Sequence, residues 1–204
     1  MGLYRRYVLP KLINSACAMP QMMALRKRYV PLAKGRVLEV GIGSGLNLEF
    51  YSDAADTLTG LDPAGELTKL AHERAMALGA VVELLKVSGE SIPAEAQTFD
   101  SIVCTWTLCS IPNVYRALGE MRRVLKPDGQ LIFIEHGAAP DPGVARVQRG
   151  LEPVWKRIGG GCHLTRQPNA LLDASGFRID RLDQGYEPGP RFAAYMYHGV
   201  ATPR

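Results

Sequence analysis

The sequence lacks any apolar run approaching the roughly 20 residues that a membrane-spanning helix needs. Its first residues also lack the long apolar segment of a secretory signal. The cysteines form no CxxC pair, and the histidines and cysteines show no ligand spacing for a metal ion; the cysteines are Cys17, Cys104, Cys109 and Cys162. We therefore expect reduced cysteines, no metal site and a cytoplasmic protein.

Acidic residues are absent from the first 35 positions, whereas basic residues are frequent there. The basic residues of this segment are Arg5, Arg6, Lys11, Arg26, Lys27, Arg28 and Lys34. All 20 acidic residues lie in the rest of the chain, which is mildly acidic although the net charge is +4. We predict a basic helical arm or lid over residues 1–35. The positive charge of this arm predicts peripheral contact with an anionic membrane surface. The alternative is that the basic residues simply form a solvated helix face without a partner. No nucleic-acid partner is expected.

The composition indicates one globular domain after this arm. The chain has 204 residues, of which 47% are hydrophobic and 22% charged, so disorder and membrane classes are excluded. Strands are predicted to alternate with helices, and two strands follow one another at the end. This order predicts an α/β fold with helices on both faces of a mostly parallel sheet and one antiparallel strand near its edge. The expected strands span 36–40, 57–62, 81–88, 99–106, 130–136, 178–183 and 192–201.

The helix signals have identifiable ends. Two helical stretches within residues 3–33 are divided near Pro20 and end before Pro31. Asn113 is a suitable N-cap for a helix over 113–125, and Gly79 suits a helix C-cap. Further helices are predicted after the glycine loop at 46–51, between 63 and 79, and over 144–158 and 169–177, with a turn at 126–129.

A glycine-rich loop, GIGSG, joins the first strand to the next segment, where an α/β sheet binds its ligand. Its glycines are Gly41, Gly43 and Gly45. A dinucleotide-binding loop places its third glycine one residue later, where this chain has Leu46. Glu39 precedes the loop and would repel a pyrophosphate while favouring a cationic ligand. The spacing therefore disfavours a nicotinamide-dependent oxidoreductase.

A second carboxylate, Asp62, ends the second strand. At this position its oxygens can accept hydrogen bonds from both ribose hydroxyls of a nucleoside. S-adenosylmethionine combines a ribose with an ammonium and a sulfonium group. The glycine loop, Glu39 and Asp62 together predict this cofactor, with S-adenosylhomocysteine as the product.

These motifs resemble class I S-adenosylmethionine-dependent methyltransferases over about residues 36–204. The matching segments are VLEVGIGSG (37–45), GLDP (60–63), SGESIP (88–93), FDSIVCTWTLCSIPN (99–113) and LKPDGQLIFIEH (125–136). The resemblance implies a Rossmann-like seven-stranded sheet with a reversed last strand. It also implies one methyltransferase domain over 36–204 that acts on a small-molecule acceptor. A protein that binds S-adenosylmethionine without turnover is the alternative.

The resemblance further implies roles for single residues. Glu39, Gly41 and Thr105 would lie at the methionine end of the cofactor. Gly43 and Gly45 belong to the same cofactor-binding loop as Gly41. Asp62, followed by Pro63, would bind the ribose. Gly89 and Glu90 would lie near the adenine, although this chain has Ser88 where the family often has Asp or Asn.

A narrower resemblance links the chain to membrane-associated methyltransferase-like proteins that methylate alkyl thiols. It rests on VCTWTLCSIPN, FIEHGAA, LEPVWKRIGGGCHLTR and YMYHGVA. A thiol acceptor reacts as its thiolate, so a nearby imidazole or cation suffices to assist it. The candidates for this assistance are His136, His163 and Arg166, with Tyr7 and Cys109 as candidate substrate contacts. The alternative acceptor is the amino headgroup of a phospholipid such as phosphatidylethanolamine. No oligomeric state is predicted.

Overall fold

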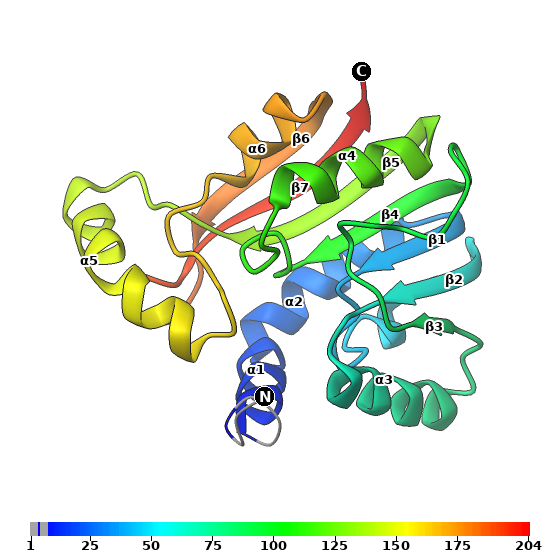
Figure 1. The fold of residues 1–204 in the computed structure, drawn as a ribbon, viewed down its shortest axis with the longest axis horizontal. Coiled ribbons are helices and arrows are strands. Elements are labelled where there is room, and N and C mark those ends of the chain that lie inside the picture. Colours follow the sequence, from blue (N-terminus) through cyan, green and yellow to red (C-terminus); the bar gives the residue numbers. More distant parts are fainter. Residues whose placement is uncertain (1–3, 5–7) are drawn as a thin grey trace.

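The computed structural model describes Tyr4 and residues 8–204 of the chain (Figure 1). The helices are α1 (Leu9–Cys17), α2 (Pro20–Tyr29), α3 (Gly65–Leu78), α4 (Val114–Val124), α5 (Pro142–Ile158) and α6 (Pro168–Ala174), with short 3₁₀ turns η2 (Val30–Leu32) and η3 (Leu48–Phe50). The strands are β1 (Gly35–Val40), β2 (Ala55–Leu61), β3 (Glu83–Leu85), β4 (Phe99–Thr105), β5 (Leu125–His136), β6 (Phe177–Tyr186) and β7 (Tyr195–Pro203). No helix in the described part of the chain is both long and apolar enough to span a bilayer.

The seven strands form one sheet in the order β3-β2-β1-β4-β5-β7-β6. The first five strands pair in parallel, and β7 pairs antiparallel with both β5 and β6. The expected seven-stranded sheet with a reversed last strand is therefore confirmed. The strand order reverses between β1 and β4, and ligands of such sheets bind beside this point at the carboxyl ends of the strands.

Alternation along the central strands gives the sheet two apolar faces. In β5, Leu131 and Phe133 pack with α4 and α6 on one face, whereas Ile132 and Ile134 pack with α2 on the other. All four side chains are fully buried. Such double coverage explains why the sequence of β5 is an almost continuous apolar run rather than an alternating one.

The predicted N-terminal arm consists of two helices with different surroundings. In α2, Met22, Leu25 and Tyr29 are buried against the sheet, so this helix belongs to the core. Leu9 and Ile13 of α1 instead face the cavity described below. The predicted division near Pro20 and the helix end before Pro31 are confirmed. Of the predicted arm, α1 therefore lies at the cavity, as a lid would, whereas α2 packs on the sheet as part of the core.

Two local expectations are wrong. Only the 3₁₀ turn η3 follows the glycine loop, because Tyr51 takes an extended backbone conformation and sends its hydroxyl to Glu39 instead of continuing a helix. The segment at 126–129 is not a separate turn but an irregularity within β5, since Phe99 and Ser101 pair with Leu125 and Gln130. The predicted caps are confirmed: the Asn113 side chain accepts from Arg116 N, and Gly79 has φ 65°.

Candidate active site

A cavity of about 390 Å³ opens at the carboxyl ends of β1, β2 and β4. Its walls come from the glycine loop, the residues after β2, the start of α3, and the segments before and after β4. Further wall residues belong to α1, to α2 and to the glycines after α5. The sequence-predicted cofactor residues that line it are Gly41, Gly43, Asp62, Pro63, Gly89 and Thr105. The cavity therefore lies at the topological switch point, as the motifs predict.

The glycine loop depends on conformations that only glycine adopts easily. Gly41, Gly43 and Gly45 have φ values of 77°, 55° and 75°. A Cβ atom at Gly41 would collide with the side chain of Thr107, which lies across the cavity wall. Gly45 does not line the cavity, and its Cβ would instead lie 2.8 Å from Leu48. Gly41 thus keeps the cavity open, whereas Gly45 allows the loop to pack on the core.

Asp62 connects the end of β2 with the glycine loop. One carboxylate oxygen accepts from Gly43 N at 3.0 Å, and the other accepts from Ala64 N at 2.8 Å. The side chain is 9% exposed, and burial raises the pKa of Asp62 although these two donors oppose the shift. Each carboxylate oxygen has a second lone pair, so Asp62 can still accept from a diol in the cavity.

Arg26, which the sequence argument did not select, reaches the cavity from α2. Its Nη1 donates to Asn47 Oδ1 at 2.5 Å and to Thr105 Oγ1 at 3.1 Å, and its guanidinium lies 4.6 Å from the centre of the Trp106 ring. The residue is only 4% exposed, and its Nε has no hydrogen-bond partner in the described structure. A buried guanidinium with an unused donor beside a cavity is suited to binding a carboxylate.

Glu39 is completely buried behind this guanidinium and does not line the cavity. It accepts from Asn47 Nδ2 at 2.8 Å and from Tyr51 Oη at 2.8 Å. Burial raises the pKa of Glu39 to about 7, although these donors and Arg26 favour the ionised form. Glu39 therefore does not line the cavity, whereas its neighbour Arg26 does, and the predicted position of Glu39 beside the methionine end of the cofactor stays a prediction.

The adenine-side segment contributes Ser88 and Gly89 to the cavity, but not Glu90. The Glu90 carboxylate accepts from Ser88 Oγ at 2.9 Å and from Asn113 N at 2.8 Å. These bonds join the segment to the start of α4. The structure therefore gives Glu90 a contact that shapes the cavity wall rather than one that faces a ligand.

Glu135 organises the segment that follows β4. Its carboxylate accepts three backbone hydrogen bonds, from Thr107 at 2.8 Å, Leu108 at 2.9 Å and Cys109 at 3.4 Å. The side chain is fully buried, and burial raises the pKa of Glu135 to about 7 against these donors. This residue, also missed by the sequence argument, fixes the position of Cys109.

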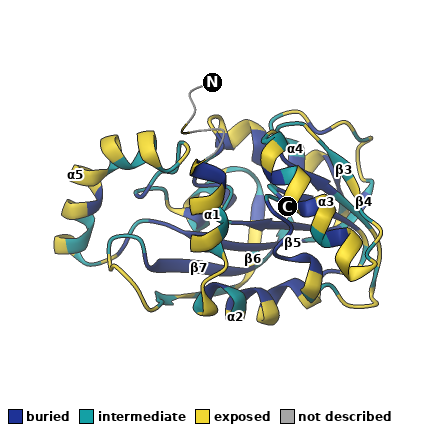
Figure 2. Ribbon diagram, turned by 90° about the horizontal axis from the view of Figure 1, so that it is seen from below, coloured by how far each residue is buried: buried dark blue, intermediate teal, exposed yellow. Residues whose placement is uncertain are grey.

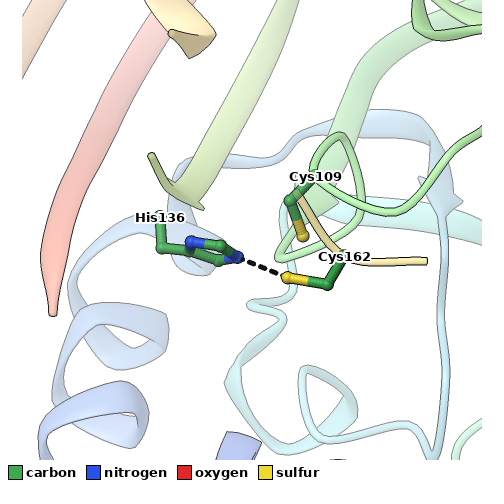
Figure 3. Close-up of side chains that lie close together, drawn as sticks. All are labelled: Cys109, His136 and Cys162. Atoms are coloured by element: carbon green, nitrogen blue, oxygen red, sulfur yellow. Dashed lines mark hydrogen bonds between the residues drawn. The ribbon is translucent and has the colours of Figure 1, made fainter. Parts of the chain in front are cut away.

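Cys109 meets His136 and Cys162 in one cluster beside the cavity. The possible ligand atoms of the three residues lie within 4.8 Å of one another, and His136 Nε2 is 2.9 Å from Cys162 Sγ (Figure 3). Neither Cys109 nor His136 lines the cavity. The sequence argument against a metal site rested on spacing along the chain, which does not register that three distant segments bring these side chains together; the expected absence of a metal stays a prediction.

The charges in this cluster are coupled. A hydrogen bond from Cys109, together with contacts to His136 and Trp155, holds the pKa of Cys162 well below that of an ordinary thiol. Burial alone would lower the pKa of His136, but the neighbouring Cys162 and Glu135 raise it above its usual value. Both shifts favour a thiolate at Cys162 and a protonated imidazole at His136.

The remaining candidates have other surroundings. His163 Nδ1 lies 3.2 Å from Glu152 Oε1 of α5, and Arg166 donates to Leu108 O and to Ile111 O. Neither residue lines the cavity. Both connect the segment after α5 to its neighbours, which favours a structural role over the predicted catalytic one. Tyr7 lies outside the described residues.

Comparison with known proteins gives the same class. Residues 38–133 match the family model described as "Methyltransferase domain". Human thiol S-methyltransferase TMT1B is 39% identical over 78% of this chain and 66% of its own length; human TMT1A is 34% identical over 77% and 69%. A phosphatidylethanolamine N-methyltransferase of Cereibacter sphaeroides is 34% identical over 64% and 65%. The chain spans just under two thirds of the rat and human TMT1B lengths, 64% and 66%.

A solved S-adenosylmethionine-dependent methyltransferase from Thermotoga maritima shares the fold, with a TM-score of 0.68 and 18% identity over 98% of this chain and 100% of that one. The fold is that of Rossmann-like S-adenosylmethionine-dependent methyltransferases, and the cavity lies at the edge of the sheet where the motifs predict the cofactor. Within this class, the chain belongs to the methyltransferase family that includes TMT1A and TMT1B.

The residues present fit this cofactor. Asp62 offers two buried oxygens for the ribose, and Ser88 and Gly89 form the wall expected for the adenine. Arg26 lines the cavity and donates through Nη1 to Thr105, at the end where the methionine carboxylate would lie, and its buried Nε has no partner in the described structure. Gly41 and Gly43 let the backbone approach closely.

Proposed function

We propose that this protein transfers a methyl group from S-adenosylmethionine to the sulfur of a small thiol. The observation that carries the proposal is the 34–39% identity to thiol S-methyltransferases over more than three quarters of the chain. The cofactor supplies a methyl group activated on a sulfonium. The protein supplies position, a dry environment and the removal of competing water.

Different residues of the cavity would hold the cofactor and exclude water. Asp62 would hold the ribose and Arg26 the carboxylate, so that the methyl group is fixed near the residues that follow β4. Leu9 and Ile13 of α1 cover the cavity with apolar side chains. Apolar cover excludes water and favours an apolar thiol over a hydrated acceptor.

Deprotonation of the acceptor requires little from the protein. A small thiol is a few per cent thiolate near neutral pH, and the thiolate is the reactive form. His136 does not line the cavity, and its Nε2 is already bound to Cys162. We therefore propose that His136 does not remove the proton of the acceptor directly.

The second candidate is N-methylation of a phospholipid amino headgroup, favoured by the identity to the Cereibacter sphaeroides enzyme. The two acceptors can be separated with one assay that follows S-adenosylhomocysteine formation. Hexanethiol and phosphatidylethanolamine vesicles would be offered separately, with Asp62→Asn as the control for cofactor-dependent turnover. Thiol turnover that rises with pH supports the proposal, whereas turnover of phosphatidylethanolamine without any thiol turnover overturns it.

Peripheral contact with an anionic membrane is a separate proposal. The segment 1–35 is basic, but Arg26 points inward and Arg28 pairs with Asp183. A second feature supports membrane contact: α5 carries exposed Val147, Leu151, Val154 and Ile158 along one face, among Arg146, Arg149 and Arg157 (Figure 2). Amphipathic helices of this kind bind bilayer interfaces.

A further inference from the structure

Cys109, His136 and Cys162 come from three separate parts of the fold. Cys109 lies in the segment after β4, His136 is the last residue of β5, and Cys162 follows the glycines that end α5. The donor set of two sulfurs and one imidazole nitrogen is one that zinc and related ions prefer. Figure 3 shows His136 Nε2 and Cys109 Sγ both directed toward Cys162 Sγ.

The distances suit a single ion. With bonds of about 2.3 Å to sulfur and about 2.0 Å to nitrogen, a tetrahedral zinc ion holds its ligand atoms roughly 3.5–3.8 Å apart. All three donor atoms here lie within 4.8 Å of one another, and the His136–Cys162 pair at 2.9 Å would need to open by only about 0.6 Å.

The surroundings hold the donors in place. Glu135 accepts from the backbone N–H of Cys109, and Cys109 O accepts from His163 N at 2.8 Å. Trp155 Nε1 donates to Cys162 Sγ at 3.3 Å, an outer contact of the kind that orients ligands. His136 Nδ1 is buried and has no partner in the described structure.

We propose that Cys109, His136 and Cys162 form a binding site for one zinc-class metal ion, with the fourth coordination position supplied from outside these three residues. Three protein ligands are the number found in zinc sites that keep one position open. The site lies directly beside the cavity, because Thr107, Ser110, Gly159 and Gly160 line that cavity.

The test uses the full chain, reduced with a phosphine and stripped of metal, and titrated with Co²⁺ as the probe. We expect one Co²⁺ per chain, with a thiolate-to-cobalt charge-transfer band that Zn²⁺ abolishes by displacement. Cys109→Ser, Cys162→Ser and His136→Ala should each weaken binding at least about tenfold. His72→Ala, at an exposed position of α3, is the matched control and should bind as the unchanged protein does.

A second measurement needs no variant in the cluster. Alkylation by iodoacetamide, read by mass spectrometry, should be slowed by Zn²⁺ at Cys162. Absence of the charge-transfer band, or a band that persists in Cys109→Ser and Cys162→Ser, overturns the metal site. Equal alkylation of Cys162 with and without Zn²⁺ overturns it as well.

Discussion

Arg26 of α2 donates a hydrogen bond to the side chain of Thr105 at the end of β4, although the two residues are 79 positions apart. The same guanidinium bonds Asn47 after the glycine loop. One side chain therefore ties α2 to the segment after the glycine loop and to the end of β4, and we expect cofactor binding to depend on the docking of this helix.

Replacing Arg26 by Gln should weaken S-adenosylmethionine binding about 10- to 100-fold, the effect of losing a hydrogen bond between charged groups. Isothermal titration calorimetry measures the change. Arg28→Gln is the matched control, because Arg28 lies on the same helix but pairs with Asp183 at the surface. Equal affinities for Arg26→Gln and the unchanged protein would exclude a carboxylate contact.

Asp62→Asn should also weaken the cofactor about 10- to 100-fold, because the amide cannot accept from two hydroxyls while it also holds Gly43 N and Ala64 N. Asp56→Asn, on the exposed part of the same strand, serves as the control and should bind normally. NAD should bind neither to the unchanged protein nor to Asp62→Asn or Asp56→Asn. An unchanged dissociation constant for Asp62→Asn contradicts the assignment of the ribose site.

The buried Glu39 carboxyl predicts a specific dependence of stability on pH. Its pKa of about 7 exceeds the ordinary value of 4.5, so the folded protein keeps a proton that the unfolded chain has released. The contribution of Glu39 to the free energy of unfolding therefore falls as pH rises from about 4.5 to about 7. The total decrease is about 3 kcal/mol, and the contribution stays low at higher pH.

Glu39→Gln removes this titration. Compared with the unchanged protein, the variant should become progressively more stable between pH 5 and pH 8, roughly the interval set by these values. Urea unfolding of both proteins at each pH measures the difference. Glu49→Gln, at an exposed position ten residues away, should show no such trend. A difference that stays constant with pH would mean that Glu39 is ionised throughout.

The apolar face of α5 predicts salt-sensitive binding to anionic vesicles. Val154→Glu should lower sedimentation with phosphatidylserine-containing vesicles several-fold, since it places a negative charge within the apolar face. Val81→Glu alters another apolar residue, which is 94% exposed and lies just before β3, and should have no effect, because β3 and α5 lie at opposite ends of the sheet (Figure 1). Added salt should weaken binding, because the Debye length is about 8 Å at physiological ionic strength. Loss of binding in both variants would indicate a general charge effect.

The sequence predicted most of the fold and the part of the site formed by local motifs. Gly41 and Asp62 could be assigned because each follows a strand directly, and the carboxyl ends of neighbouring parallel strands meet at one edge of the sheet. Glu90 was misjudged because proximity along the chain to Gly89 does not determine which way its side chain turns. Glu39 likewise lies in β1 as predicted but does not line the cavity.

Long-range partners could not be predicted. Arg26 looked like one of several surface cations in a basic segment, and only the packing of α2 against the sheet turns it inward. His136 and Cys162 are 26 residues apart and join only because the segment after α5 returns to the end of β5. No local periodicity or spacing encodes such a meeting.

The late position of β7 in the sequence has a consequence for biosynthesis. β7 pairs with β5 on one side and β6 on the other, so one edge of each of these two strands stays unpaired until β7 has been synthesised. The nascent chain meanwhile exposes these strand edges, which are prone to association with other chains. His136 ends β5. Its surroundings can therefore be completed only after β7 has been synthesised, and chaperone demand should be highest before that point.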